Sequence, residues 1–121
     1  MILIVGGAYQ NKRTFAMARF GLTPEDFCDC AQSAPDFSKP ALCHLEQYVL
    51  RCVREGQDEA ALLNAPLDDK ILIFDDISCG VVPLDAETRA WRERSGRLAA
   101  ELAQRADEVW RVFFGLGERI K

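Results

Sequence analysis

The stretch that decides the fold is residues 2–14, which read Ile2-Leu3-Ile4-Val5-Gly6-Gly7-Ala8-Tyr9-Gln10-Asn11-Lys12-Arg13-Thr14. Its first four residues are continuously apolar, which is typical of a strand buried on both faces of a parallel sheet. A glycine pair follows. Residues 12–20 then have the apolar spacing of a helix, and Gly21 ends it. This order predicts a buried strand, a glycine-containing loop and a helix.

The rest of the chain continues this alternation. Residues 70–74 and 108–114 have the composition of strands, and Gly115 and Gly117 then turn the chain into a short tail. Residues 41–55, 58–64 and 85–106 are predicted helices, of which the last is capped by Asp85. Residues 22–40 are expected to be an irregular surface segment, although Thr23-Pro24-Glu25 has the pattern of a helix start. Residues 77–84 are expected to be a loop.

Composition limits the class of protein. The chain has 121 residues, 49% of them hydrophobic and 28% charged, which suits one globular domain over residues 1–121. No apolar run approaches the roughly 20 residues of a membrane-spanning helix. The sequence opens on an apolar strand with no basic lead, so we expect a cytoplasmic protein without a secretory signal. A net charge of −4 gives no general electrostatic reason to bind nucleic acid.

The loop after the first strand is a candidate phosphate-binding loop. Such loops follow G-x-x-x-x-G-K-[ST] between a strand and a helix, because glycines let backbone N–H groups converge on phosphate oxygens. Gly6 and Lys12 match this pattern, whereas Asn11 replaces the second glycine and Arg13 replaces the hydroxyl that binds magnesium. Asn tolerates the left-handed conformation better than most residues. Thr14 comes one residue late, about 100° further around the helix.

The sequence therefore predicts a P-loop-type domain with three layers, in which helices flank a mainly parallel sheet. The loop residues expected to contact a nucleotide are Gly6, Gly7, Ala8, Asn11, Lys12, Arg13 and Thr14. The alternative is a plain Gly-Gly turn with Lys12 in solvent.

Three further residues are candidates for chemistry. Asp75 and Asp76 directly follow the strand at 70–74, and the carboxyl ends of strands form the ligand crevice of open α/β sheets. A carboxylate there can hold a magnesium ion or accept a proton, or it can simply cap a turn. His44 is the single histidine. It could act as a general base or nucleophile near the loop, or lie in solvent on the polar face of its helix.

The chain contains five cysteines, an odd number that argues against a disulfide framework. Cys28-Asp29-Cys30 and Cys43-His44 contain metal-binding residue types. However, neither shows the paired C-x2-C spacing that is usual in zinc sites. Buried thiols are therefore the favoured interpretation.

Both ends of the chain resemble the adenosylcobinamide kinase / adenosylcobinamide-phosphate guanylyltransferase family of cobalamin biosynthesis. The resemblance covers MILIVGGAYQNK at residues 1–12 and the segment from residue 77 to residue 121. In that segment the matching residues are Gly80, Val82, Pro83, Arg92, Gly96, Arg97, Ala106, Asp107, Glu108, Val109, Trp110, Gly115, Ile120 and Lys121.

The resemblance implies a nucleotide-dependent transferase that uses GTP or ATP with Mg²⁺ and acts on a corrinoid, cobinamide. It also implies a homo-oligomer. The implied catalytic residues are Lys12, Asp76 and His44, with Asp75 and Asp76 as metal ligands.

Family enzymes are longer between the first helix and the last third, where their guanylylated histidine lies, and the surroundings of His44 do not align with it. One alternative is a relative that binds a nucleotide or corrinoid without catalysing transfer. Another is a structural module whose ligand site has decayed.

Overall fold

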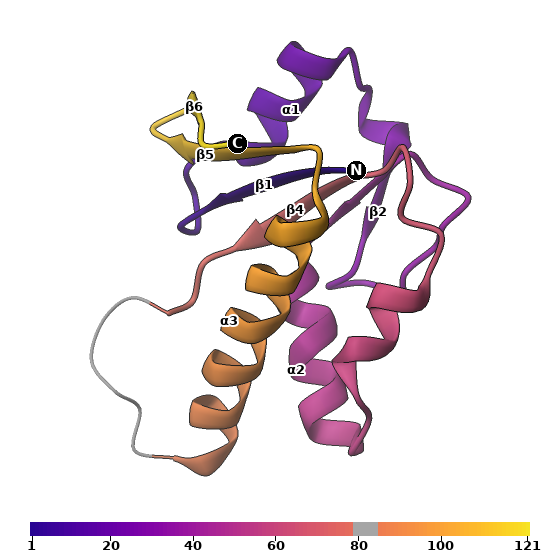
Figure 1. The fold of residues 1–121 in the computed structure, drawn as a ribbon, viewed down its shortest axis with the longest axis vertical. Helices are drawn as coiled ribbons and strands as arrows, with labels where there is room; N and C mark the ends of the chain where they lie inside the picture. Colours follow the sequence, from indigo (N-terminus) through magenta and orange to yellow (C-terminus); the bar gives the residue numbers. More distant parts are fainter. Residues whose placement is uncertain (79–84) are drawn as a thin grey trace.

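The strands form one mostly parallel six-stranded sheet with the order β2-β3-β4-β1-β5-β6 in a computed structural model that describes residues 1–78 and 85–121 (Figure 1). At its centre, β1 (Ile2–Gly6) pairs in parallel with β4 (Ile71–Asp75) and β5 (Glu108–Phe113). The shorter β3 (Ala41–Cys43) and β2 (Phe27–Asp29) extend the sheet beyond β4, also in parallel. The antiparallel β6 (Leu116–Arg119) closes the opposite edge.

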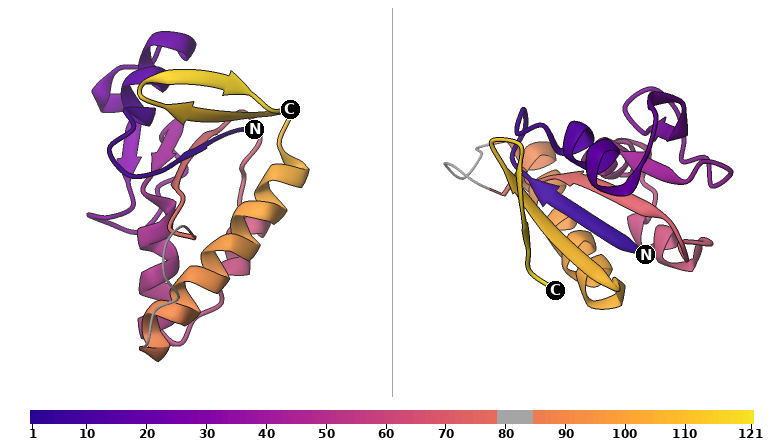
Figure 2. Two further views of the ribbon diagram at one scale, coloured as in Figure 1. Left: turned by 90° about the vertical axis from the view of Figure 1, so that its left-hand side faces the viewer. Right: turned by 90° about the horizontal axis from the view of Figure 1, so that it is seen from above.

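Helices cover both faces of this sheet. The helix α1 (Lys12–Phe20) lies on one face, where Ala16 packs near Ile4 and Val112. The helices α2 (Leu45–Glu55) and α3 (Ala86–Arg105) lie on the other face, around Leu72 and Leu102 (Figures 1 and 2). Two 3₁₀ turns, η1 (Pro24–Asp26) and η2 (Glu59–Asn64), connect these elements. The expected three-layer α/β architecture is thus confirmed.

Three local expectations were wrong. Residues 41–43 are strand β3, and the predicted helix begins only at Leu45. The strand is three residues long and fully buried. In the sequence, the apolar residues Leu42 and Leu45 therefore have the three-residue spacing of one helical face, although Leu42 belongs to the strand. The helix start expected at Thr23-Pro24-Glu25 is confirmed as η1. The rest of the segment 22–40, expected to be irregular, contains the three-residue β2, and the tail after Gly115 contains β6.

The other elements agree with their expected positions within about two residues. Gly21 and Gly56 end α1 and α2 in the left-handed conformation, and the Asp85 side chain accepts a hydrogen bond from the backbone of Thr88 at the start of α3. Most of the expected loop at 77–84, including the matched Gly80, Val82 and Pro83, lies outside the described residues. No helix among residues 1–78 and 85–121 has the length and apolar content needed to cross a membrane.

The glycine at the end of β1 is required by a close approach of β5. A Cβ atom added at Gly6 would lie 2.5 Å from the backbone oxygen of Val112, which an adjacent strand holds in place. By contrast, outside the backbone of its own helix, no atom of residues 1–78 and 85–121 lies within 4 Å of a Cβ atom added at Gly96 in α3. The chain can therefore leave the sheet at position 6 only with a residue that lacks a side chain.

We predict that Gly6→Ala lowers the free energy of unfolding by roughly 1–3 kcal/mol, because the strand contact has no room for a methyl group. The matched variant Gly96→Ala should raise it by about 0.5–1 kcal/mol, because it removes a helix-interior glycine without a clash. Urea denaturation of both variants checks this. Equal stability of the two would contradict the close contact.

Candidate functional site

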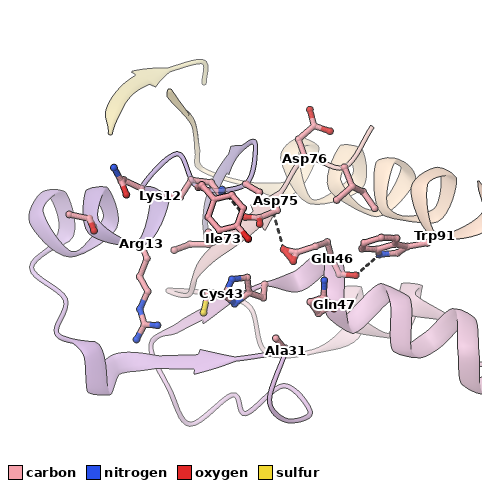
Figure 3. A pocket seen from close by; sticks show the side chains of 16 residues that line it. Lys12, Arg13, Ala31, Cys43, Glu46, Gln47, Ile73, Asp75, Asp76 and Trp91 are labelled. Atoms are coloured by element: carbon pink, nitrogen blue, oxygen red, sulfur yellow. Dashed lines mark hydrogen bonds and ion pairs between the residues drawn. The ribbon is translucent and has the colours of Figure 1, made fainter. Parts of the chain in front are cut away.

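A pocket of about 580 Å³ opens at the carboxyl edge of the parallel strands (Figure 3). The end of β4, the loop between β1 and α1, and the start of α2 form most of its walls. The predicted site residues that line it are Ala8, Asn11, Lys12, Arg13, Thr14, His44, Asp75 and Asp76. Of the predicted residues only Gly6 and Gly7 do not line it. Residues from distant parts of the sequence are therefore brought together as the α/β fold predicts.

The loop between β1 and α1 is tightly turned. Tyr9 and Asn11 both adopt the left-handed conformation, with φ of 62° and 64°. Asn11 immediately precedes α1, and its backbone oxygen accepts the hydrogen bond from Phe15 that begins the helix. The asparagine thus adopts the conformation that made it the expected substitute for glycine here.

Lys12 is the central charged residue of the pocket. Only 5% of its side chain is exposed, and its Nζ lies 2.7 Å from Asp75 Oδ1 (Figure 3). The ammonium group also donates a hydrogen bond to the Gly7 carbonyl. The alternative of a solvated lysine is therefore wrong. The buried ion pair connects the loop after β1 to the end of β4.

The two aspartates after β4 point in different directions. Asp75 faces Lys12, whereas the Asp76 carboxylate points away from that pair (Figure 3). Asp76 Oδ1 accepts hydrogen bonds from the backbone and the hydroxyl of Ser78, at 2.8 and 2.5 Å. The metal-binding role of the two carboxylates stays a prediction, and in this arrangement they do not converge on one point.

Arg13 does not point toward Asp75. Its guanidinium lies 4.6 Å from the centre of the Phe27 ring and donates a hydrogen bond to the Pro24 carbonyl at 3.3 Å. In Figure 3 the side chain extends away from Lys12 toward the β2 side of the pocket. The position after Lys12 is therefore occupied by an arginine whose guanidinium contacts η1 and β2.

His44 lies between β3 and α2 in the left-handed conformation, with φ of 56°. Its Nδ1 lies 2.7 Å from Asp29 Oδ1, at the end of β2, and its side chain is 42% exposed. The imidazole is therefore oriented by a carboxylate and also borders the pocket. Its catalytic role stays a prediction.

Cys28, Cys30, Cys43 and Cys52 are buried free thiols, which agrees with the favoured interpretation. Burial raises the pKa of the Cys43 thiol to about 12, and it also raises the pKa of Cys30. Cys43 lines the pocket, next to His44. The fifth cysteine, Cys79, lies outside the described residues.

Glu46 is a site residue that the sequence analysis missed. It is 2% exposed, its Oε1 accepts a hydrogen bond from the Asp75 backbone at 3.1 Å, and its backbone oxygen accepts one from the Trp91 indole. Burial, and then the nearby Asp75 carboxylate, raise the pKa of Glu46 to about 7. Its Oε2 has no hydrogen-bond partner among the described residues. If residues 41–43 had been recognised as a strand, Glu46 would have been expected close to the carboxyl end of that strand, at the pocket.

The donor set of the pocket fits phosphate and, in part, magnesium. The Lys12 ammonium and the N-terminus of α1 favour an anion at this edge. Oxygen donors from Thr14, Asp75 and Asp76 border the pocket and suit a hard cation. The usual hydroxyl ligand directly after the lysine is absent, because Arg13 occupies that position.

We predict that Lys12→Met destabilises the protein by roughly 2–4 kcal/mol, because it leaves the Asp75 carboxylate largely buried without its partner. The double variant Lys12→Met/Asp75→Asn should recover most of this loss, because it removes the unpaired charge as well. Chemical denaturation of the wild type, both single variants and the double variant gives the coupling energy. Additive effects of the two substitutions would show that the pair is not coupled.

Comparisons with known proteins point to one family. A family model for cobinamide kinase / cobinamide phosphate guanyltransferase matches residues 39–120. One relative is the bifunctional adenosylcobalamin biosynthesis protein CobU of Salmonella typhimurium, 39% identical over 51 residues. The protein of the same name from Escherichia coli strain K12 is 37% identical over 51 residues.

Each match spans 42% of this chain and 28% of the relative. The chain thus matches under a third of the length of these relatives, and the family match begins after the loop that contains Lys12. The match to the family model nevertheless extends over most of the chain and includes β3, Glu46 and the Asp75-Asp76 pair. The chain belongs to the cobinamide kinase / cobinamide phosphate guanyltransferase family.

Proposed function

We propose that this protein is a nucleotide-dependent transferase of cobalamin biosynthesis that binds GTP or ATP in the pocket at the carboxyl edge of the sheet. The observation that carries the proposal is the position of Lys12. Its ammonium group is buried at the start of α1, within reach of the loop backbone and of Asp75. Asp75 and the Gly7 carbonyl hold this ammonium group at the N-terminus of α1, where the helix also favours an anion, so a phosphate bound there could contact both.

The loop residues would bind the phosphates through backbone groups. Gly6 brings the chain close to β5, and Gly6 and Gly7 together leave the loop free of Cβ atoms near its start. The N–H groups at the beginning of α1 have no partners within the helix, so they can donate to phosphate oxygens. Lys12 would then exchange part of its contact with Asp75 for the charge of the phosphates.

Magnesium, when bound, would neutralise phosphate charge and align the leaving group. Of the predicted metal ligands Asp75 and Asp76, we propose Asp76 as the side chain that would hold it, since Asp75 is paired with Lys12. Phosphoryl transfer depends mainly on positioning and charge stabilisation, so these residues can serve it without a covalent intermediate. The corrinoid acceptor that we propose is cobinamide, by extension from the family name.

A second candidate is binding without transfer, and Arg13 favours it. The arginine stands where a magnesium-binding hydroxyl is expected and points toward β2 (Figure 3). A protein with this loop would hold nucleotide with little dependence on magnesium. Both candidates place the ligand in the same pocket. A homo-oligomer, a cytoplasmic location and a single domain also stay predictions.

We predict that GTP or ATP raises the thermal unfolding midpoint by several degrees at about a hundred times its dissociation constant. Lys12→Ala should lose this shift, while Lys70→Ala, a lysine outside the pocket, should keep it. Differential scanning fluorimetry with each nucleotide, with and without Mg²⁺, measures the effect. Because Lys12→Ala can lower the unfolding midpoint by itself, the shift caused by nucleotide is measured for each variant from that variant's midpoint without nucleotide.

Magnesium dependence and product formation then separate the two candidates. A transferase should show a shift that increases with Mg²⁺ and should phosphorylate cobinamide or transfer GMP to cobinamide phosphate. Arg13→Ser should strengthen the magnesium dependence, because it restores a hydroxyl after the lysine. A shift without magnesium dependence or product supports the binder. No shift with any nucleotide would overturn both.

A further inference from the structure

Three chemically different donors meet at the rim of the pocket on the β2–β3 side. They are Asp29 at the end of β2, Cys43 at the end of β3, and His44 directly before α2. One ligand atom of each lies within 4.8 Å of the others. We propose that these side chains bind a transition-metal ion of the zinc class, with one coordination position open to the pocket.

The backbone fixes the three donors relative to one another. Asp29 and Cys43 are register partners across the parallel strands β2 and β3. The backbone N–H of Cys30 donates to the Cys43 carbonyl at 3.0 Å, and that of Ala31 donates to Asp29 Oδ1 at 2.9 Å. His44 follows Cys43 directly in the chain, and its Nδ1 already contacts Asp29 Oδ1 at 2.7 Å. Binding a metal would therefore require side-chain rotation and little backbone movement.

Two buried polar groups beside this cluster have no partner within the described part of the chain. The Cys43 side chain is 2% exposed and makes no hydrogen bond there, and it faces the pocket. Glu46 Oε2, also 2% exposed at the residue level and also on the pocket wall, is unsatisfied. An unsatisfied buried carboxyl oxygen such as Glu46 Oε2 carries a free-energy cost unless a ligand or ion completes its coordination, whereas a buried thiol packs as a small apolar group and is available as a ligand. A cation bound in the pocket would explain why the Cys43 thiol and Glu46 Oε2 lie on the same wall.

The mixture of donors selects the kind of metal. A thiolate sulfur, an imidazole nitrogen and a carboxylate oxygen are all ligands of Zn²⁺, whereas Mg²⁺ and Ca²⁺ take oxygen ligands. Three protein ligands with a fourth position for water or substrate is the arrangement of catalytic zinc sites. Ligand atoms on one tetrahedral zinc ion lie roughly 3.3–3.8 Å apart. On binding, the Asp29–His44 pair at 2.7 Å would therefore separate slightly, and any separation near the 4.8 Å limit of the cluster would shorten. On binding, the Cys43 thiol releases its proton to solvent.

This proposal is independent of nucleotide binding, because none of the three donors belongs to the loop that contains Lys12. It does change the role expected for His44. An imidazole that ligates a metal cannot at the same time be a nucleophile. The structure thus assigns His44 to the metal and leaves phosphate binding to the opposite wall of the pocket.

We predict that metal-free protein binds one Co²⁺, without nucleotide, and develops the strong absorption of a cobalt–thiolate bond. Zn²⁺ should abolish this absorption by displacement, and millimolar Mg²⁺ should leave it unchanged. Cys43→Ser should lose the cobalt–thiolate band. His44→Ala and Asp29→Asn, both at partly exposed positions, should weaken Co²⁺ binding by roughly tenfold or more.

The matched control is Cys52→Ser, which removes a buried thiol in α2, away from the cluster, and should keep the band. Circular dichroism shows whether each variant is folded. If Cys43→Ser does not fold, the two partly exposed variants decide the question. Absence of a thiolate band in the wild type, or an equal band in His44→Ala and Asp29→Asn, would overturn the site. Because nucleotide is absent from the assay, this outcome leaves the proposed nucleotide binding unaffected.

Discussion

The ion pair between Lys12 and Asp75 is the interaction on which the pocket depends. It joins the first residue of α1 to the last residue of β4, two elements about sixty residues apart in the sequence. Because the pair is largely shielded from water, each charge needs the other. The backbone of Asp75 also donates to Glu46, so the same residue ties α2 to the strand. Three walls of the pocket therefore meet at one residue, Asp75, through its carboxylate and its backbone N–H.

That arrangement also explains how the loop tolerates departures from the common phosphate-binding pattern. Asn11 adopts the left-handed conformation that a glycine would adopt, so the lysine keeps its position at the start of the helix. Arg13 is accommodated because its side chain stacks over Phe27 and leaves the pocket centre free. In the phosphate-binding role that we propose, the lysine lies at the start of the helix as that role requires, whereas Arg13 occupies the position of the usual magnesium-binding hydroxyl.

The sequence predicted the elements whose residues carry a long or repeated signal. The apolar runs at 2–5 and 70–74, the long helix after Asp85, and the convergence of Lys12, Asp75 and Asp76 on one edge all follow from patterns that span several residues. The strands β2 and β3 were missed because a strand of three residues shows no period that separates it from a helix. Glu46 was missed for the same reason, since its place at the sheet edge depends on β3. That Asp29 would contact His44 also could not be predicted, because it requires the register of those two strands.

The unequal lengths of the strands give the two sides of the pocket different local stabilities. On the Lys12 side, β1 is paired over five positions with β4 and four with β5. On the His44 side, β3 is paired over only two positions with β4, and β2 lies at the edge of the sheet. Short strands at or beside the edge of a sheet open more readily than central ones, so amide hydrogens in β2 and β3 should exchange with solvent faster than those in β1. A ligand that contacts both sides of the pocket would therefore stabilise the folded chain chiefly by suppressing local opening of β2 and β3.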